Sequence, residues 1–242
     1  MIGTILNVAG ILIGGLFGLA RRKPLSAASE AYFKVILGAF TVFYGLRLTW
    51  ISISGSAYEI LKQLLIVIVS MMLGKLLGRA LHLQKISNGI GRRARDQISS
   101  ARPEDPNRLN NGFRTCAALF CAAPLGILGA TQEGLSLSQY IYPLAIKGVM
   151  DGLASMGFVS LFGPGVLLSA LPVLALQGTL SLVIARVVEP ILSLHNLLNS
   201  VNAVGGLLVF SVALVILGLK RIELADYLPS LIVAPLLTLW WR

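Results

Sequence analysis

The chain has 242 residues, of which 56% are hydrophobic and only 12% are charged, and its mean hydropathy is +0.82. Soluble domains carry about a quarter charged residues, so this composition excludes a soluble globular protein. The formal net charge of +10 does not indicate a nucleic-acid partner, because the basic residues gather in a few loops, which is the positive-inside pattern of membrane proteins.

Apolar runs recur from one end of the chain to the other, and each has the roughly 20 residues that an α-helix needs to cross a bilayer. Strands of a membrane barrel would instead alternate apolar and polar residues over about ten positions. We therefore expect an all-α, polytopic protein of the lipid bilayer, with residues 1–242 forming a single integral membrane domain. Eight transmembrane helices are predicted, over residues 2–20, 34–53, 60–81, 113–131, 138–161, 164–187, 201–219 and 224–241.

The first predicted span carries a stripe of small residues at helical spacing. Gly10, Gly14 and Gly18 form a tandem GxxxG, and the third span repeats the pattern with Gly74 and Gly78. Because missing side chains let helix backbones approach closely, this motif predicts helix packing, either within the subunit or in a homodimer.

Basic residues are concentrated in the segment 82–112, between the third and fourth spans. A solvated basic loop in the cytoplasm is the favoured interpretation, and an amphipathic surface helix near anionic lipid is the alternative for its first part. Placing the N-terminus outside puts residues 21–34, 79–114 and 220–221 in the cytoplasm. Both termini are therefore predicted to lie outside.

The fourth span contains Pro124, followed by Gly126 and Gly129. Proline removes a backbone donor and clashes with the preceding turn, so a broken helix is predicted. Backbone groups freed in this way are tolerated at membrane depth only beside protein or a water-filled cavity. Gln132 and Glu133 follow directly and are candidate substrate- or ion-binding residues. The alternative is a simple proline kink, with Glu133 at the outer interface.

The fifth span holds Lys147, Asp151 and Ser155 at successive i, i+4 positions, so all three share one helix face. In a functional interpretation, Asp151 carries a proton or holds a cation, and Lys147 is its counter-charge or an anion contact. In a structural interpretation, the pair is a neutral bridge that fixes helix packing. The functional interpretation is favoured, because membrane helices rarely retain ionisable residues without a use.

Three further polar residues lie in predicted spans: Asn7 on the small-residue stripe of the first, Gln177 in the sixth and Asn202 in the seventh. A buried amide needs hydrogen-bond partners, so Gln177 is a candidate to line the same cavity as the charged pair. Asn202 lies on the same helix face as Gly206 and is a further candidate. For Asn7, an interhelical hydrogen bond is favoured over a ligand contact.

The second and seventh spans share a pattern in which a glycine, six residues and a small residue precede a leucine, beginning at Gly38 and Gly206. Segments 1–81 and 164–242 are therefore candidate repeats that flank central helices at 113–161. A three-span unit ends on the side of the membrane opposite its start. Because two helices lie between the copies, the second copy would start on the other side of the membrane and would therefore be inverted. Inverted repeats are typical of secondary transporters; chance resemblance among Gly- and Leu-rich helices is the alternative.

No motif in the sequence indicates an enzyme, because nucleophile–base arrangements, HExxH and Walker sequences are absent. Cys116 and Cys121 are five residues apart in one apolar run, which places them on different helix faces and favours neither a disulfide nor a metal site. We expect no metal and no cofactor.

A series of motifs runs along the whole chain in a fixed order. They are Asn7 with Gly14-Gly15-Leu-Phe-Gly18, Leu119-Phe-Cys121 through Gly126-Ile-Leu-Gly129 to Glu133-Gly134, Lys147 to Asp151, Ser169 to Pro172 with Gln177, and Ala203-Val-Gly-Gly206 and Leu228-Pro229. By these motifs the chain resembles the YqgA/YdfK-like family of bacterial multi-pass membrane proteins over essentially its whole length. Pro124 departs from the small or polar residues expected near that position. The resemblance implies a prokaryotic inner-membrane location and supplies no substrate.

These features together predict a small secondary transporter with a site near the membrane midplane. The site would combine the broken fourth span, the face of Lys147 and Asp151, and Gln177. H⁺ or Na⁺ would be the coupling ion, and the substrate a small polar or charged solute. The alternative, from another class, is a channel-like or structural membrane protein in which the charged pair only fixes helix packing.

Overall fold

The computed structural model describes residues 1–20, 26–102, 104–135 and 141–241. Within these ranges the regular elements are helices and no strand is present, which confirms the all-α fold class. The basic residues at 21–23 and the first three residues of the predicted fifth span lie outside the described residues.

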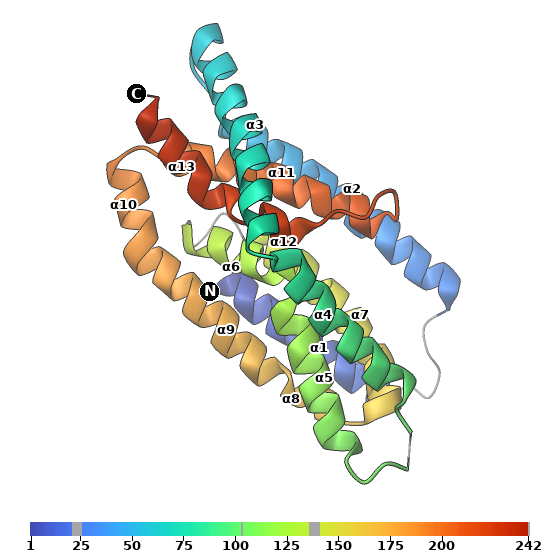
Figure 1. Cartoon of the computed structure of the whole chain (residues 1–242). Helices are drawn as coiled ribbons and strands as arrows, with labels where there is room; N and C mark the ends of the chain where they lie inside the picture. Colours follow the sequence, from blue (N-terminus) through green and yellow to red (C-terminus); the bar gives the residue numbers. More distant parts are fainter. Residues whose placement is uncertain (21–25, 103, 136–140, 242) are drawn as a thin grey trace. The chain divides into compact units, whose positions relative to one another are not determined.

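The chain divides into two compact units, each drawn from both halves of the sequence. Figure 1 labels the helices α1 to α13 that make up these units. Unit 1 comprises residues 1–29 and 86–183, and unit 2 comprises residues 30–85 and 184–242. Unit 1 holds α1 (Ile2–Ala20), most of α4 (Leu83–Ser99), α5 (Arg108–Ala122), α6 (Pro124–Leu135), α7 (Tyr142–Phe162), α8 (Gly165–Leu168) and α9 (Ala170–Val183). Unit 2 holds most of α2 (Ala27–Ile51), α3 (Ala57–Ala80), the π-helix η1 (Ile184–Val188), α10 (Glu189–Leu194), α11 (Leu198–Ile216), α12 (Leu224–Tyr227) and α13 (Ser230–Trp240).

The described residues contain six helical stretches that are long and apolar enough to cross a membrane, or seven if the bent pair of α5 and α6 counts as one. The six are α1, α2, α3, α7, the continuous stretch Gly165–Leu194, and α11. A polytopic helical membrane protein is therefore confirmed, but the predicted number of eight spans is not.

The eighth predicted span, 224–241, is interrupted. It consists of α12, with four residues, and α13, with 11, and the apolar stretch Leu224–Trp240 is shorter than the other spans. Pro229 stands at the break, where its missing N–H stops the first helix from continuing. The 17 residues of Leu224–Trp240 would rise about 26 Å as one helix, slightly less than a hydrocarbon core about 30 Å thick. Apolar composition alone did not reveal this interruption.

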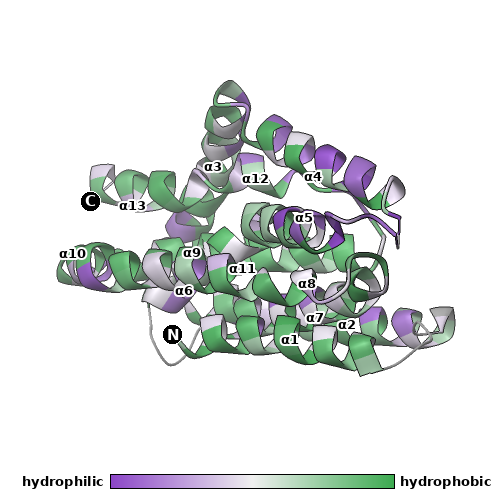
Figure 2. Cartoon of the chain, turned by 90° about the horizontal axis from the view of Figure 1, so that it is seen from below, coloured by the Kyte–Doolittle hydropathy of each residue, from purple (hydrophilic) through white to green (hydrophobic). Residues whose placement is uncertain are grey.

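The segment 82–112 is mostly helical, so the favoured prediction of a solvated loop is wrong for α4. Ile90, Ala94 and Ile98 recur at i, i+4 spacing, and each is buried or partly buried, whereas Arg92 and Arg93 are exposed. Figure 2 shows hydrophilic and hydrophobic residues mixed along α4, while α1 is hydrophobic over most of its length. The many basic residues of this segment indicated a loop, but these apolar residues line up on one face when the segment is helical.

Helices α1 and α7 of unit 1 pack closely and in parallel. A Cβ atom at Gly14 would lie 2.0 Å from the carbonyl oxygen of Gly152, so the two backbones touch where side chains are missing. The facing pairs are Gly10 with Gly148, Gly14 with Gly152, and Gly18 with Met156. Since both numbers rise together, the helices run in the same direction. The predicted GxxxG stripe therefore packs within the chain.

The bent pair of α5 and α6 follows α7 from one end to the other. Arg108, which begins α5, donates from Nε to the carbonyl oxygen of Leu161 near the end of α7 over 2.6 Å. Gly129 of α6 packs on Leu144 at the start of α7. The two helices are bent by 57° at their junction. The pair therefore runs antiparallel to α7, as the predicted broken span would.

Unit 2 uses the same close packing of small residues. Gly45 of α2 and Gly206 of α11 face each other, and the Thr49 hydroxyl donates to the carbonyl oxygen of Ala203 over 3.2 Å. The predicted pattern in α3 packs within unit 2: Gly74 lies against Ser230 and Gly78 against Asp226. Van der Waals contact of this kind drives helix association in lipid, where burial of apolar surface contributes little.

Candidate functional site

Lys147 and Asp151 form a buried ion pair near the middle of α7. The Nζ of Lys147 donates a hydrogen bond to Oδ2 of Asp151, one helical turn further along. The two residues are only 2% and 8% exposed. Their contact offsets part of the cost of removing both charges from water, but such a pair rarely stabilises a fold more than apolar residues would.

Side chains from three other helices surround the pair. Asn7 of α1 donates from Nδ2 to Oε1 of Gln177 in α9 over 3.0 Å, and its side chain lies close to the Asp151 carboxylate. The ring of Phe120 in α5 has its centroid 5.7 Å from the Nζ of Lys147, a cation–π distance. We call Asn7, Lys147, Asp151 and Gln177 the polar cluster.

The start of α6 lies directly against the polar cluster. A Cβ atom at Gly126 would lie 2.9 Å from Cε of Lys147 and 3.1 Å from Nε2 of Gln177, so the glycine leaves room for both side chains. Pro124 cannot donate to the carbonyl of Phe120 four residues earlier, which frees a backbone acceptor at the break. The helix break therefore lies at the level of the ion pair.

Several buried polar atoms around the pair have no hydrogen-bond partner. They include Oδ1 of Asn7, Nε2 of Gln177 and Oγ of Ser155, which lies one turn beyond Asp151 on α7. A buried donor or acceptor that lacks a partner costs about 1–3 kcal/mol. Native proteins contain few such atoms, so several in one place require an explanation such as a bound molecule.

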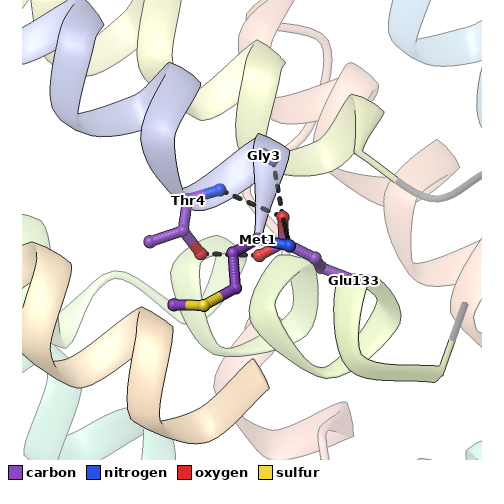
Figure 3. Close-up of polar contacts among 4 residues, drawn as sticks. All are labelled: Met1, Gly3, Thr4 and Glu133. Atoms are coloured by element: carbon purple, nitrogen blue, oxygen red, sulfur yellow. Dashed lines mark hydrogen bonds and ion pairs between the residues drawn. The ribbon is translucent and has the colours of Figure 1, made fainter. Parts of the chain in front are cut away.

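Glu133 has a different role, at the end of α6 (Figure 3). Its carboxylate accepts hydrogen bonds from the backbone N–H of Gly3 over 2.6 Å and of Thr4 over 3.3 Å, and from the Thr4 hydroxyl over 2.6 Å. The N-terminal ammonium of Met1 lies 3.4 Å away. A carboxylate is well placed here, because the first N–H groups of a helix lack intrahelical acceptors and carry the positive end of its dipole.

The predicted site residues thus fall into three groups. Asn7, Lys147, Asp151 and Gln177 come together, with Ser155 one turn away. Gln132 and Glu133 are both buried further along α6, where both side-chain polar atoms of Gln132 have no hydrogen-bond partner. Asn202 is buried in α11 and belongs to unit 2.

Three residues near these groups were not identified from the sequence. Ser181, fully buried one turn beyond Gln177 with an unpartnered hydroxyl, shares its helix face at an i, i+4 spacing that could have been noticed. Thr4 lies one turn before Asn7 and offers a similar signal. Phe120 offers none, because it meets Lys147 only through the folding of α5 against α7.

The polar cluster is closed in this conformation. A groove of about 520 Å³ in unit 1 is lined by α4 and the first part of α5, including Arg93, Gln97, Asn111 and Arg114, and does not reach the ion pair. Among the described residues, no three His, Cys, Asp or Glu side chains lie close enough to hold a metal ion. The cluster can exchange protons, cations or hydrogen-bonded solutes only if the surrounding helices separate.

Residues 2–239 match the family model described as protein of unknown function (DUF554). The chain is 31% identical over 235 residues to the uncharacterized membrane protein YdfK of Bacillus subtilis, covering 97% of this chain and 94% of that protein. It is 27% identical over 243 residues to the uncharacterized protein YqgA of Escherichia coli, covering 100% of this chain and 97% of that protein. No solved structure matches significantly.

Proposed function

The chain belongs to the DUF554 family, and we propose that it is a small secondary transporter of a small polar or charged solute, coupled to H⁺ or Na⁺. The observation that carries this proposal is the ion pair of Lys147 and Asp151, buried in α7 and surrounded by polar groups with unused bonding capacity. Charged residues inside membrane helices are costly and commonly mark ion or substrate pathways.

The helix break supports the same proposal. Many transporters bind their substrates where a membrane helix is interrupted, because the free backbone groups at the break are additional ligands. In this chain the junction of α5 and α6, bent by 57°, lies beside Lys147 through Phe120 and Gly126. Backbone and side-chain ligands would therefore be available at one level of the bundle.

Coupling would act through Asp151. A proton on this carboxylate, or a Na⁺ beside it, would weaken its bond to Lys147 and release the ammonium for other partners. An ion can favour one conformation only by binding it better than the other, so the bond between Lys147 and Asp151 is the contact expected to differ between the closed and open states.

The membrane arrangement proposed with this function is a prokaryotic inner-membrane protein, homodimeric and without catalytic activity, whose two termini lie outside. The basic stretches support this orientation by the positive-inside rule. Inverted repeats remain part of the proposal, and the packing within each unit is compatible with them. The first candidate span packs on the sixth, the second on the seventh and the third on the eighth, as α1 with α9, α2 with α11 and α3 with α13.

A structural or channel-like protein is the second candidate, and the closed state of the cluster favours it. The charges of Lys147 and Asp151 already neutralise each other, and neither residue lines the groove found among the described residues of unit 1. In that case the pair fixes the packing of α7 against its neighbours.

Replacing both charges discriminates between the two candidates. Purified protein in liposomes would be supplied with a defined mixture of small polar metabolites under an imposed H⁺ or Na⁺ gradient, and uptake would be measured by mass spectrometry. A transporter predicts uptake that the double variant Lys147→Met with Asp151→Asn abolishes. The control variant Lys75→Met, in α3 of unit 2, is expected to retain uptake. If the double variant keeps all solute flux and only its melting temperature changes, the pair is structural.

A further inference from the structure

The polar cluster presents one positive and one negative charge on a single helix face. Lys147 and Asp151 are four residues apart, so their side chains begin about 5–6 Å from each other. Each at present satisfies the other. A solute that enters between them must replace the contact that each charge loses, because a buried charge left without a partner is strongly unfavourable.

The surrounding amides have defined orientations. The hydrogen bond between them fixes both side chains, because Nδ2 of Asn7 donates to Oε1 of Gln177 over 3.0 Å. Asn7 also packs against Gly148 of α7, which lies between the two charged residues in sequence. This arrangement leaves Oδ1 of Asn7 and Nε2 of Gln177 as the two atoms without partners.

The two unused atoms match the charges beside them. Oδ1 of Asn7, which lies close to Asp151, accepts hydrogen bonds and therefore suits a cationic group of a solute, which donates them. Nε2 of Gln177 lies near the side chain of Lys147, because this atom and Cε of Lys147 are both about 3 Å from the Cβ position of Gly126. Nε2 donates hydrogen bonds and therefore suits an anionic group, which accepts them. An acceptor therefore accompanies the negative charge, and a donor accompanies the positive charge.

From this arrangement we infer that the solute is a zwitterion, with an ammonium that binds Asp151 and Asn7 and a carboxylate that binds Lys147 and Gln177. The inference rests on the proposed transport function and specifies its substrate class. A cation alone would leave Lys147 without a partner, and an anion alone would leave Asp151 without one. A zwitterion satisfies both charges and keeps the site neutral overall, which a membrane interior favours.

The test uses the purified full-length protein and the twenty protein amino acids as probes. Each is titrated while the melting temperature is measured, and every amino acid that raises it is compared with its decarboxylated amine and its deaminated acid. At least one amino acid is expected to bind, and its amine and acid counterparts to bind at least 100-fold more weakly. Equal binding by an amine or an acid, or no binding by any of the twenty, overturns the inference.

Variants of Gln177 test the assignment of the carboxylate end. Gln177→Glu keeps an acceptor for Asn7 but replaces the donor near Lys147 with a negative charge, so amino-acid binding is expected to fall at least 100-fold. Gln177→Met removes the donor and is expected to weaken binding about tenfold or more. Thr179→Ala, at an exposed position of the same helix, is the matched control and is expected to bind normally. Unchanged binding by Gln177→Glu contradicts the assignment.

Failure of this inference can be distinguished from failure of the proposed function. If the metabolite mixture yields gradient-driven flux of a non-zwitterionic solute, and that flux requires Lys147 and Asp151, transport stands and the zwitterion assignment is wrong. If flux is unaffected when both charges are removed, both are wrong.

Discussion

Glu133, at the end of the broken span, accepts a hydrogen bond of 2.6 Å from the hydroxyl of Thr4 in the first turn of α1. Two backbone N–H groups, of Gly3 and Thr4, donate to the same carboxylate. The start of the first helix is therefore fixed by a residue about 130 positions away in sequence. Because its oxygens are so fully occupied, we expect this carboxylate to be a structural group, although its position in an apolar span made it a candidate ligand.

Glu133→Gln is expected to destabilise the protein by about 1–3 kcal/mol, because it removes the charge and turns one acceptor into a donor that faces other donors. The measurement is thermal unfolding in detergent, with Glu104→Gln, at an exposed position, as the control. Solute flux per folded molecule is expected to be unchanged. Loss of flux without loss of stability would make Glu133 a transport residue after all.

Removing one charge of the ion pair is expected to lower the free energy of unfolding more than removing both charges. Lys147→Met leaves a buried carboxylate without its partner, and Asp151→Asn leaves an ammonium, so each single variant should lose roughly 3–5 kcal/mol. The double variant should recover much of that loss. A double-mutant cycle of unfolding free energies measures the coupling; additive effects would mean that the two side chains do not interact.

The contact of α1 with α7 predicts strong intolerance of side chains at Gly14. Gly14→Ala places a methyl group 2.0 Å from the carbonyl oxygen of Gly152, so the helices must separate, at an expected cost of about 1–3 kcal/mol. Gly157→Ala, in α7, has no atom within 4 Å of the added carbon and is the matched control. The oligomeric mass should be the same for both variants, because the Gly14 contact lies within the chain; dissociation of a dimer by Gly14→Ala alone would assign the stripe to a subunit interface.

A buried and an exposed carboxylate of unit 2 are expected to differ in their contribution to stability. Asp226, which is 4% exposed, accepts a hydrogen bond of 2.8 Å from the backbone N–H of Gln84. Its replacement by Ala should cost about 1.5–3 kcal/mol. Glu223 pairs with Arg79 over 3.3 Å at the surface, so Glu223→Ala should cost less than about 1 kcal/mol. Equal losses of unfolding free energy would contradict this role of burial.

Those features of the chain that depend on local interactions could be predicted from the sequence. Lys147 and Asp151 are four residues apart on one helix, so their contact follows from helix geometry alone. The glycine stripe that begins at Gly10 also identified a close packing surface. The partner surface, around Gly148, could not be assigned, because many Gly-rich helices in the chain offer similar surfaces.

The contacts that complete the site depend on tertiary structure. Asn7 and Gln177 were each recognised as buried amides, but 170 positions separate them and nothing local indicates that they share a hydrogen bond. Phe120 was missed because its contact with Lys147 arises from the course of α5 along α7. The eighth span is not confirmed for a related reason: average hydropathy does not register that Pro229 divides an apolar run.

The central claim, that the polar cluster opens to water during function, is tested most directly at Ser155, which is fully buried in the closed state. In a chain with Cys116 and Cys121 replaced by Ala, the Ser155→Cys variant would be treated with a membrane-impermeant maleimide from each side of a liposome. The Ser160→Cys variant, altered at an exposed position of α7, is the control for reagent access. Transport predicts that the thiol introduced by Ser155→Cys is labelled and that the labelling rate changes when an H⁺ or Na⁺ gradient is imposed. Complete protection of that thiol from both sides under every gradient, while the Ser160→Cys control is labelled, would contradict the claim.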